Sequence, residues 1–202
     1  MSLRHLAALG LAGLSAACVF SGGPKPSLAQ ARVSSDFDTY RIRRVGLLPF
    51  DGRGLSTERR LELQHAFHSE LSQSTPFEIV LLGEDDLDEL LPSEPHRRGT
   101  YRPRTIIGLS QRYNLDGILF GTVTQERFFP PLLLTVQLDM VAAETGLVIW
   151  TSGVHLDAGD PRVAEGLRYH YEGGEDENAW RLALLSPELF ARFAAFQIAC
   201  LL

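Results

Sequence analysis

The side chains best suited to hold a metal ion are two histidines that lie one helical turn apart. His65 and His68 belong to a segment with helical spacing, and Glu62 or Glu70 could share an ion with them. A zinc site needs three or four protein ligands at a defined spacing. No further ligand occurs at such a spacing, so we expect surface histidines and no metal ion.

Three other patterns that could support chemistry are incomplete. Gly52 and Gly54 stand where a phosphate-binding loop has glycines, but no Gly-Lys-Ser or Gly-Lys-Thr follows. No serine lies in a Gly-x-Ser-x-Gly elbow, and residues 175–177 lack the alternating ligands of a calcium loop. We therefore expect no catalytic residues, no cofactor and no enzyme activity. A secreted hydrolase or a metal-dependent enzyme is the least favoured function.

The amino-terminal residues have the pattern of an export signal. Arg4 precedes residues 6–20, which carry no charge. This run has the length of a signal-peptide core and is shorter than the roughly 20 residues of a membrane-spanning helix. The sequence therefore predicts export across a membrane.

The leader can end in more than one way. Residues 14–18 resemble a bacterial lipobox, which predicts palmitate attached at Cys18, although Ser15 stands where such sequences prefer leucine. The rival is the Ala-Gln-Ala at 29–31, which would release a soluble periplasmic protein that starts at Arg32. An uncleaved anchor is the third possibility.

Length and composition favour one folded domain. The chain has 202 residues, of which 45% are hydrophobic and 22% charged, typical of a globular protein. We assign residues 1–18 to a signal peptide, 19–40 to a flexible tether with glycines and prolines, and 41–202 to a single globular domain.

The net charge of -6 argues against binding to nucleic acid, because phosphate affinity depends on clustered Lys and Arg. One basic cluster contains Arg97 and Arg98. It is either a solvated loop or a contact for an acidic partner or lipid headgroups.

The order of apolar runs and breakers predicts a mixed α/β (α+β) fold with a single sheet of about five strands. Three of the strands form an antiparallel meander over residues 118–156, because apolar and polar residues alternate there. Helices are expected to pack on the sheet and to cover one of its faces. The other expected elements are strands at 42–50 and 77–82, and helices at 56–75, 84–91, 103–114, 161–171 and 186–202.

Ser56 or Thr57 and Ser186 are expected to cap two of these helices, and Asn114 to end a third in the left-handed conformation. The four-residue spacing of Leu63, Phe67 and Leu71 predicts an amphipathic helix, and Cys200 is expected to be a small buried hydrophobic residue.

Three segments together resemble a family of envelope lipoprotein domains. Residues 45–50, 113–123 and 138–150 are similar to the first strand, a helix-to-strand junction and a Thr-Gly-x-x-x-Trp hairpin of that family. It includes the curli-secretion lipoprotein CsgG, the LpoB-type activators of penicillin-binding proteins and the amino-terminal domain of TolB. The resemblance implies a small α/β domain, often likened to an anticodon-binding domain, that docks or assembles proteins in the periplasm without catalytic residues.

A short turn carries the best candidate for partner binding. Phe128 and Phe129 precede two prolines between the first two strands of the meander. Exposed aromatic side chains are common anchors for a protein partner. The alternative is that both rings fold back under the helices. A turn of this length also argues against a membrane barrel like that of the curli channel, whose crossings need about 9 to 11 residues each.

These observations predict a lipid-anchored periplasmic assembly or accessory factor, held at the outer membrane of the cell envelope, that binds protein partners of an envelope machine. The alternative is a structural subunit that oligomerises into a larger envelope complex. The sequence does not identify the partner.

Overall fold

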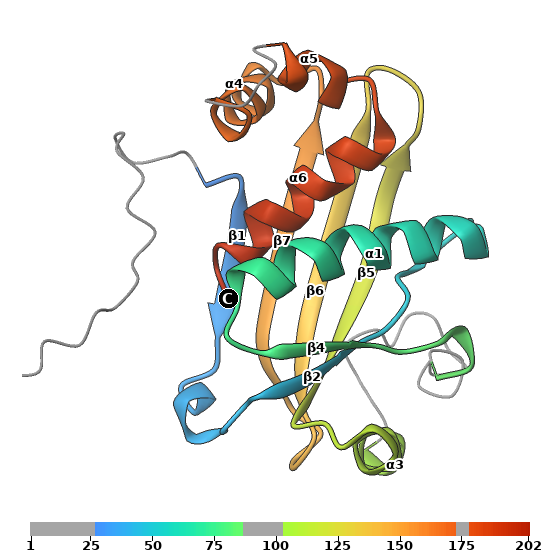
Figure 1. Cartoon of the computed structure of the whole chain (residues 1–202), viewed down its shortest axis with the longest axis vertical. Helices are drawn as coiled ribbons and strands as arrows, with labels where there is room; N and C mark the ends of the chain where they lie inside the picture. The colour runs from blue at the N-terminus through green and yellow to red at the C-terminus, as the bar shows by residue number, and fades with distance from the viewer. Residues whose placement is uncertain (1–26, 87–102, 173–177) are drawn as a thin grey trace, which may run out of the picture.

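The computed structural model describes residues 27–86, 103–172 and 178–202. It shows one mixed α/β unit with a single sheet and helices packed on it (Figure 1). The strands are β1 (Ala29–Val33), β2 (Arg44–Leu47), β3 (Asp51–Gly52), β4 (Glu78–Leu81), β5 (Gly117–Arg127), β6 (Leu133–Ala142) and β7 (Val148–Asp157). The helices are η1 (Phe37–Thr39), α1 (Thr57–Ser74), α3 (Pro103–Tyr113), α4 (Pro161–His170), α5 (Ala179–Ala183) and α6 (Pro187–Ala199).

The sheet has the strand order β1-β7-β6-β5-β2-β4, and β3 pairs with the far part of β5. The antiparallel meander β5-β6-β7 is confirmed. The number of strands differs from the prediction, since the sheet has seven strands and not about five. The two that were missed are β1 and β3. Both are short, with five and two residues, so their sequences are too short to show a clear hydrophobic periodicity.

Helices α1 and α6 cover one face of the sheet and lie side by side across it (Figure 1). The four-residue spacing in α1 buries Leu63, Phe67 and Leu71 against this face, as the sequence predicted. Trp150 of β7 is buried in the same layer, and its indole N–H donates to the Leu201 carbonyl at 3.2 Å. The carboxyl-terminal residues are thereby tied to the sheet.

Helix α3 packs on the opposite face. Successive side chains of a strand point to opposite faces, so Ile118 and Phe120 of β5 meet Ile106 and Leu109 of α3, while Leu119 joins the core under α1. The described helices therefore pack on both faces of the sheet and not on one face, as the sequence had suggested, because β5 has apolar side chains on both of its faces.

Side chains satisfy the backbone at several helix ends. Ser56 and Ser186 cap α1 and α6, each accepting from the backbone N–H three residues later. After α3, Asn114 has the left-handed conformation, with φ of 54°. All three positions were predicted. Buried Gln64 was not predicted; its amide donates to the carbonyls of Leu47 at 2.7 Å and Leu82 at 2.8 Å.

The amino-terminal edge of the sheet lies within residues 19–40, where the sequence predicted a flexible tether. Of these, residues 29–33 form β1 and pair with residues 150–154 of β7. Ala29 is buried in the core. The difference arises because a five-residue edge strand gains its stability from the ladder to β7, which local sequence does not show.

The two ends of the meander face different surroundings. At one end β1 begins, β7 ends, and β5 joins β6 through the turn of Phe128 and Phe129; we call this the Phe-Pro end. Helices α4 and α5 lie at this end (Figure 1). At the other end β5 begins and β6 turns into β7, next to α3. We call it the pocket end.

Candidate functional site

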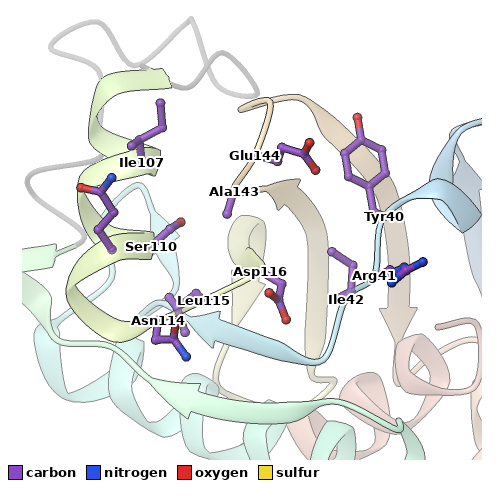
Figure 2. Close-up of a pocket in the computed structure, with 11 residues that line it drawn as sticks. Tyr40, Arg41, Ile42, Ile107, Ser110, Asn114, Leu115, Asp116, Ala143 and Glu144 are labelled. Atoms are coloured by element: carbon purple, nitrogen blue, oxygen red, sulfur yellow. The ribbon is translucent and has the colours of Figure 1, made fainter.

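An open pocket of about 560 Å³ lies at the pocket end of the sheet (Figure 2). Three separate segments form it: the chain before β2, the carboxyl-terminal half of α3 with the loop into β5, and the turn between β6 and β7. Its lining residues are Tyr40, Arg41, Ile42, Ile107, Ser110, Gln111, Asn114, Leu115, Asp116, Ala143 and Glu144.

Asp116 holds the floor of the pocket together. Its carboxylate accepts the backbone N–H groups of Arg43 at 2.9 Å and Arg44 at 3.0 Å. Its own backbone N–H donates to the Arg44 carbonyl at 2.8 Å. These bonds join the start of β2 to the start of β5, so the Asp116 carboxylate has a positioning role.

The hydroxyl of Ser110 is the unusual group in the pocket wall. Its Oγ is buried and has no hydrogen-bond partner among the residues that the structure describes. A buried hydroxyl without a partner is unfavourable by about 1–3 kcal/mol. In Figure 2 Ser110 lies on α3 beside the opening, between Ile107 and Asn114. Exposed polar side chains of the wall, such as Gln111 and Glu144, accompany the apolar side chains of Ile107 and Ile42.

A second depression, of about 660 Å³, lies on the part of the sheet face near β1, β7 and β6. Its polar side chains bind one another. Thr135 Oγ1 lies 2.7 Å from His155 Nδ1, and the Gln137 amide donates to Asp139 at 3.0 Å. Thr151 also donates to Asp139. Because these groups already satisfy each other, this surface is a weaker candidate for ligand binding than the pocket around Ser110.

The structure places the two histidines of α1 outside the core. His65 is exposed and lines a shallow depression with Glu62 and residues of α6, and His68 is half-buried. Glu70 is drawn to α6, where Arg192 Nε lies 3.5 Å from its Oε1. Within residues 27–86, 103–172 and 178–202, no three His, Cys, Asp or Glu side chains are grouped so that they could hold a metal ion.

The turn at the Phe-Pro end exposes both of its aromatic rings. Phe128 is 50% exposed and Phe129 is 69% exposed, so neither ring folds back under the helices. Arg127 donates to the Pro131 carbonyl across the turn, and the Pro130-Pro131 peptide bond is cis. Binding of a partner to these rings stays a prediction.

Arg59 lies behind this turn in a buried ion pair. Its guanidinium donates to Glu126 at 2.8 Å and to Glu62 at 2.8 Å, and its carbon Cζ lies 5.6 Å from the ring centre of Phe128. Burial raises the pKa of the Glu126 carboxyl above its ordinary value, and attraction to Arg59 opposes this rise without cancelling it.

Several residues singled out in the sequence fall elsewhere. Cys18, Arg97, Arg98 and the acidic residues 175–177 lie outside the described residues. Gly54, with φ of 80°, belongs to the turn before α1, where the Ser56 side chain accepts the backbone N–H of Arg59. This agrees with a structural turn. Cys200, expected to be buried, is exposed because it follows the last turn of α6.

No helix in the described part of the chain combines the length and the apolar character needed to cross a bilayer.

The sequence did not single out the pocket residues. Tyr40, Ser110 and Glu144 come from segments that are far apart in the chain and carry no shared motif. The only local signal was Asn114, which marks the end of α3.

Comparison with known proteins gives structural neighbours only. No protein-family model and no curated protein sequence matches the chain. Among solved structures, the chain is similar to the PelC dodecamer from Paraburkholderia phytofirmans, with 8% identity, a TM-score of 0.44, and coverage of 82% of this chain and 96% of that chain. The lipoprotein GNA1162 from Neisseria meningitidis is 10% identical, with a TM-score of 0.43 and coverage of 66% of this chain and 99% of that chain. LpoB from E. coli is 11% identical, with a TM-score of 0.43 and coverage of 77% of this chain and 83% of that chain. At these values the similarity does not define what this chain does.

Proposed function

We propose that this chain is a lipid-anchored accessory or assembly factor of the bacterial cell envelope, held on the periplasmic side of the outer membrane through Cys18. It acts by binding other proteins, and the proposal includes no catalytic step. The observation that carries it is the arrangement of the domain: the described chain begins at the Phe-Pro end, and the open pocket lies at the opposite end. A tethered body of this kind presents its pocket away from its anchor.

The position of β1 supports lipidation at Cys18 over cleavage after residue 31. Cleavage after Ala31 would cut β1 in its middle and remove buried Ala29. Cleavage before Cys18 leaves the whole strand on the mature chain. The folded domain is therefore compatible with the lipobox and would be damaged by the rival site.

The pocket suits a polypeptide segment of a partner. A peptide presents backbone N–H and C=O groups together with apolar side chains, and the pocket is lined by the exposed polar side chains of Gln111 and Glu144 as well as by Ile107 and Ile42. Ile107 is a large apolar side chain that is 42% exposed on the pocket rim. Exposed apolar side chains at a concave site are typical contacts for a partner.

Site-specific photo-crosslinking in intact cells tests the pocket. With p-benzoylphenylalanine in place of Ile107, we expect an adduct with an envelope protein. The matched control is the same probe in place of exposed Ser72, on the far side of α1 from the core. The Ile107→Asp variant should weaken capture of that protein by about tenfold or more, because truncating a central contact changes binding by about 2 kcal/mol. Equal adducts at both positions, or none at 107, would count against the pocket.

A separate experiment tests the lipid anchor at Cys18. Intact-mass analysis of the mature chain from the membrane fraction should give an amino terminus at Cys18 with acyl chains, and Cys18→Ala should remove the lipid. A mature, unmodified chain that starts at Arg32 would refute the anchor.

The outer edge of β1 favours a second function, that of an oligomerising structural subunit. No described strand pairs with this edge, and Val33 on β1 is 53% exposed. Free backbone groups on an edge strand can pair with another copy. Light scattering of the detergent-solubilised chain distinguishes the two functions. If the chain is a monomer and Val33→Lys does not change its molar mass, the function as an oligomerising subunit is excluded.

A further inference from the structure

Two separate segments form an exposed apolar patch at the Phe-Pro end. Phe128 and Phe129 come from the turn between β5 and β6. Leu182 of α5 and Leu185 just after it are 55% and 60% exposed. We call these four side chains the Phe-Leu patch. Isolated surface leucines are common, but two adjacent aromatic rings with two leucines at one end of a small domain mark an interaction surface.

Arg59 holds the two segments of the patch together. Its guanidinium lies over the Phe128 ring and also donates to the Pro187 carbonyl at 3.5 Å, at the start of α6. The connection that carries Leu185 therefore lies beside the phenylalanine turn, and Figure 1 shows the β5-β6 turn next to α5 at the top of the molecule. A buried ion pair with Glu126 holds Arg59 in place next to the Phe128 ring.

The chain enters the folded domain at this same end. Ala29 pairs with Val154, near the end of β7. Leu28 contacts both α4 and α6. Its backbone N–H donates to Gln197 Oε1 of α6 at 3.2 Å, and its side chain lies against Gly166 of α4. β1 and β5 are three strand spacings apart, roughly 15 Å. Through β7 and β6, Ala29 is level with Val123 of β5, so the phenylalanine turn lies five residues, or roughly 17 Å, farther along β5. The chain enters β1 from the side of that turn.

The distance from Cys18 to this end is short. Nine residue steps separate Cys18 from Ser27, which span at most about 32 Å when fully extended. A flexible chain of that length has a mean end-to-end distance of about 17 Å. If Cys18 carries the lipid, as proposed above, the Phe-Leu patch stays within a few nanometres of the bilayer. Tethering then raises its local concentration near the membrane to the millimolar range, so a weak contact is well populated.

The charges around the patch point to an apolar contact and not to an electrostatic one. Arg162 is paired with Asp160 at 2.7 Å, and Arg127 lies 3.9 Å from Asp157. These arginines are therefore neutralised within the domain and do not form a basic surface for anionic headgroups. Aromatic and leucine side chains enter the interfacial zone of a bilayer by burying apolar area, with little dependence on salt.

We infer that the Phe-Leu patch rests in the lipid surface to which the chain is tethered and orients the domain with its pocket end pointing away from the membrane. This inference rests on the proposed lipid anchor. It assigns Phe128 and Phe129 a lipid contact in place of the protein contact that the sequence suggested.

Photo-crosslinking of the full-length chain in bacterial membranes tests the orientation. With p-benzoylphenylalanine in place of Phe129, irradiation should give a lipid adduct, seen as a small mass increase on the intact chain. The same probe in place of Leu147, which is 61% exposed in the turn at the pocket end, is the matched control. We expect at least about tenfold more lipid adduct at 129 than at 147, since the proposed orientation buries position 129 in the bilayer interface and holds position 147 away from it. Leu185 provides a second position if the chain substituted at 129 folds poorly.

The possible outcomes distinguish a failure of the proposed orientation from a failure of the proposed lipid anchor. A protein adduct at both 129 and 185, or equal lipid adducts at 129 and 147, would overturn the lipid contact. The same mass spectrum reports the acyl chains on Cys18. A lipidated chain without a lipid adduct at 129 and 185 refutes only the orientation, whereas a chain without acyl groups refutes the anchor itself.

Discussion

At the scale of single residues, Glu126 is a buried carboxylate whose negative charge is only partly compensated. Its side chain is 7% exposed, and one carboxylate oxygen, Oε2, is buried without a hydrogen-bond partner in the described structure. The other oxygen accepts from Arg59. Burial disfavours the charged form by more than the arginine favours it, so the pKa of Glu126 is raised.

This raised pKa predicts a specific dependence of stability on pH. The folded chain binds the Glu126 proton more tightly than the unfolded chain does. The resulting stabilisation is complete below the unfolded pKa of 4.5 and is lost as the pH rises through the higher folded value. Glu126→Gln should remove this component, so the difference in unfolding free energy between the two proteins changes with pH above about 4.5.

Urea denaturation of both proteins at several pH values measures the effect. Carboxyl groups that make no contact with Arg59 or Glu126 keep their surroundings in both chains, so they cancel in the difference. A difference that is the same at every pH would contradict the assignment to Glu126.

At the scale of secondary-structure elements, the contact between β5 and α1 depends on the absence of a side chain at Gly121. A Cβ atom there would lie 2.4 Å from Phe50 Cε1. Phe50 in turn packs on Phe67 of α1, with ring centres 4.6 Å apart. Neither ring has free space to move into, because both are fully buried.

We predict that Gly121→Ala lowers the unfolding free energy by about 1–3 kcal/mol, the usual effect of overpacking a core. Gly108→Ala in α3 is the matched control, since a Cβ there meets nothing within 4 Å. That change should be neutral or stabilise the protein by up to about 1 kcal/mol through helix propensity. Thermal denaturation compares the melting temperatures of the two variants. Equal melting temperatures would show that Phe50 adjusts to the added methyl group without strain.

At the scale of the whole molecule, residues 27–33 connect the sheet, α4 and α6. Ala29 lies in the main core, Leu28 packs against it, and Gln30 accepts from the Ser152 hydroxyl at 2.9 Å through its carbonyl. These residues also determine at which end a preceding segment joins the domain. The edge of the sheet and the direction of tethering therefore depend on the same short strand.

A chain that starts at Arg32 should consequently be less stable than one that starts at Ser27. It loses the burial of Ala29 and Leu28 and part of the β1 ladder, which together contribute about 1–3 kcal/mol. Chemical denaturation of the two chains provides the comparison. Identical midpoints would mean that β1 is dispensable and would restore cleavage after residue 31 as an acceptable processing site.

The sequence alone determined those features that depend on neighbouring residues. Ser56, Asn114 and Ser186 act on their own helix ends, and they were predicted for that reason. The alternation of apolar and polar residues in β6 likewise predicted the meander, because a strand with two unlike faces has a period of two.

Only the tertiary structure decided the remaining features. β1 exists as a strand because β7 offers it a ladder, and α3 could be assigned to the second face only once Ile118 and Leu119 were seen to point apart. The pocket joins residues about 100 positions apart, such as Tyr40 and Glu144, and the Phe-Leu patch joins a turn to a helix through Arg59. Contacts between distant segments leave no periodic trace in the sequence, since each segment contributes one or two side chains and the chain's path brings them together.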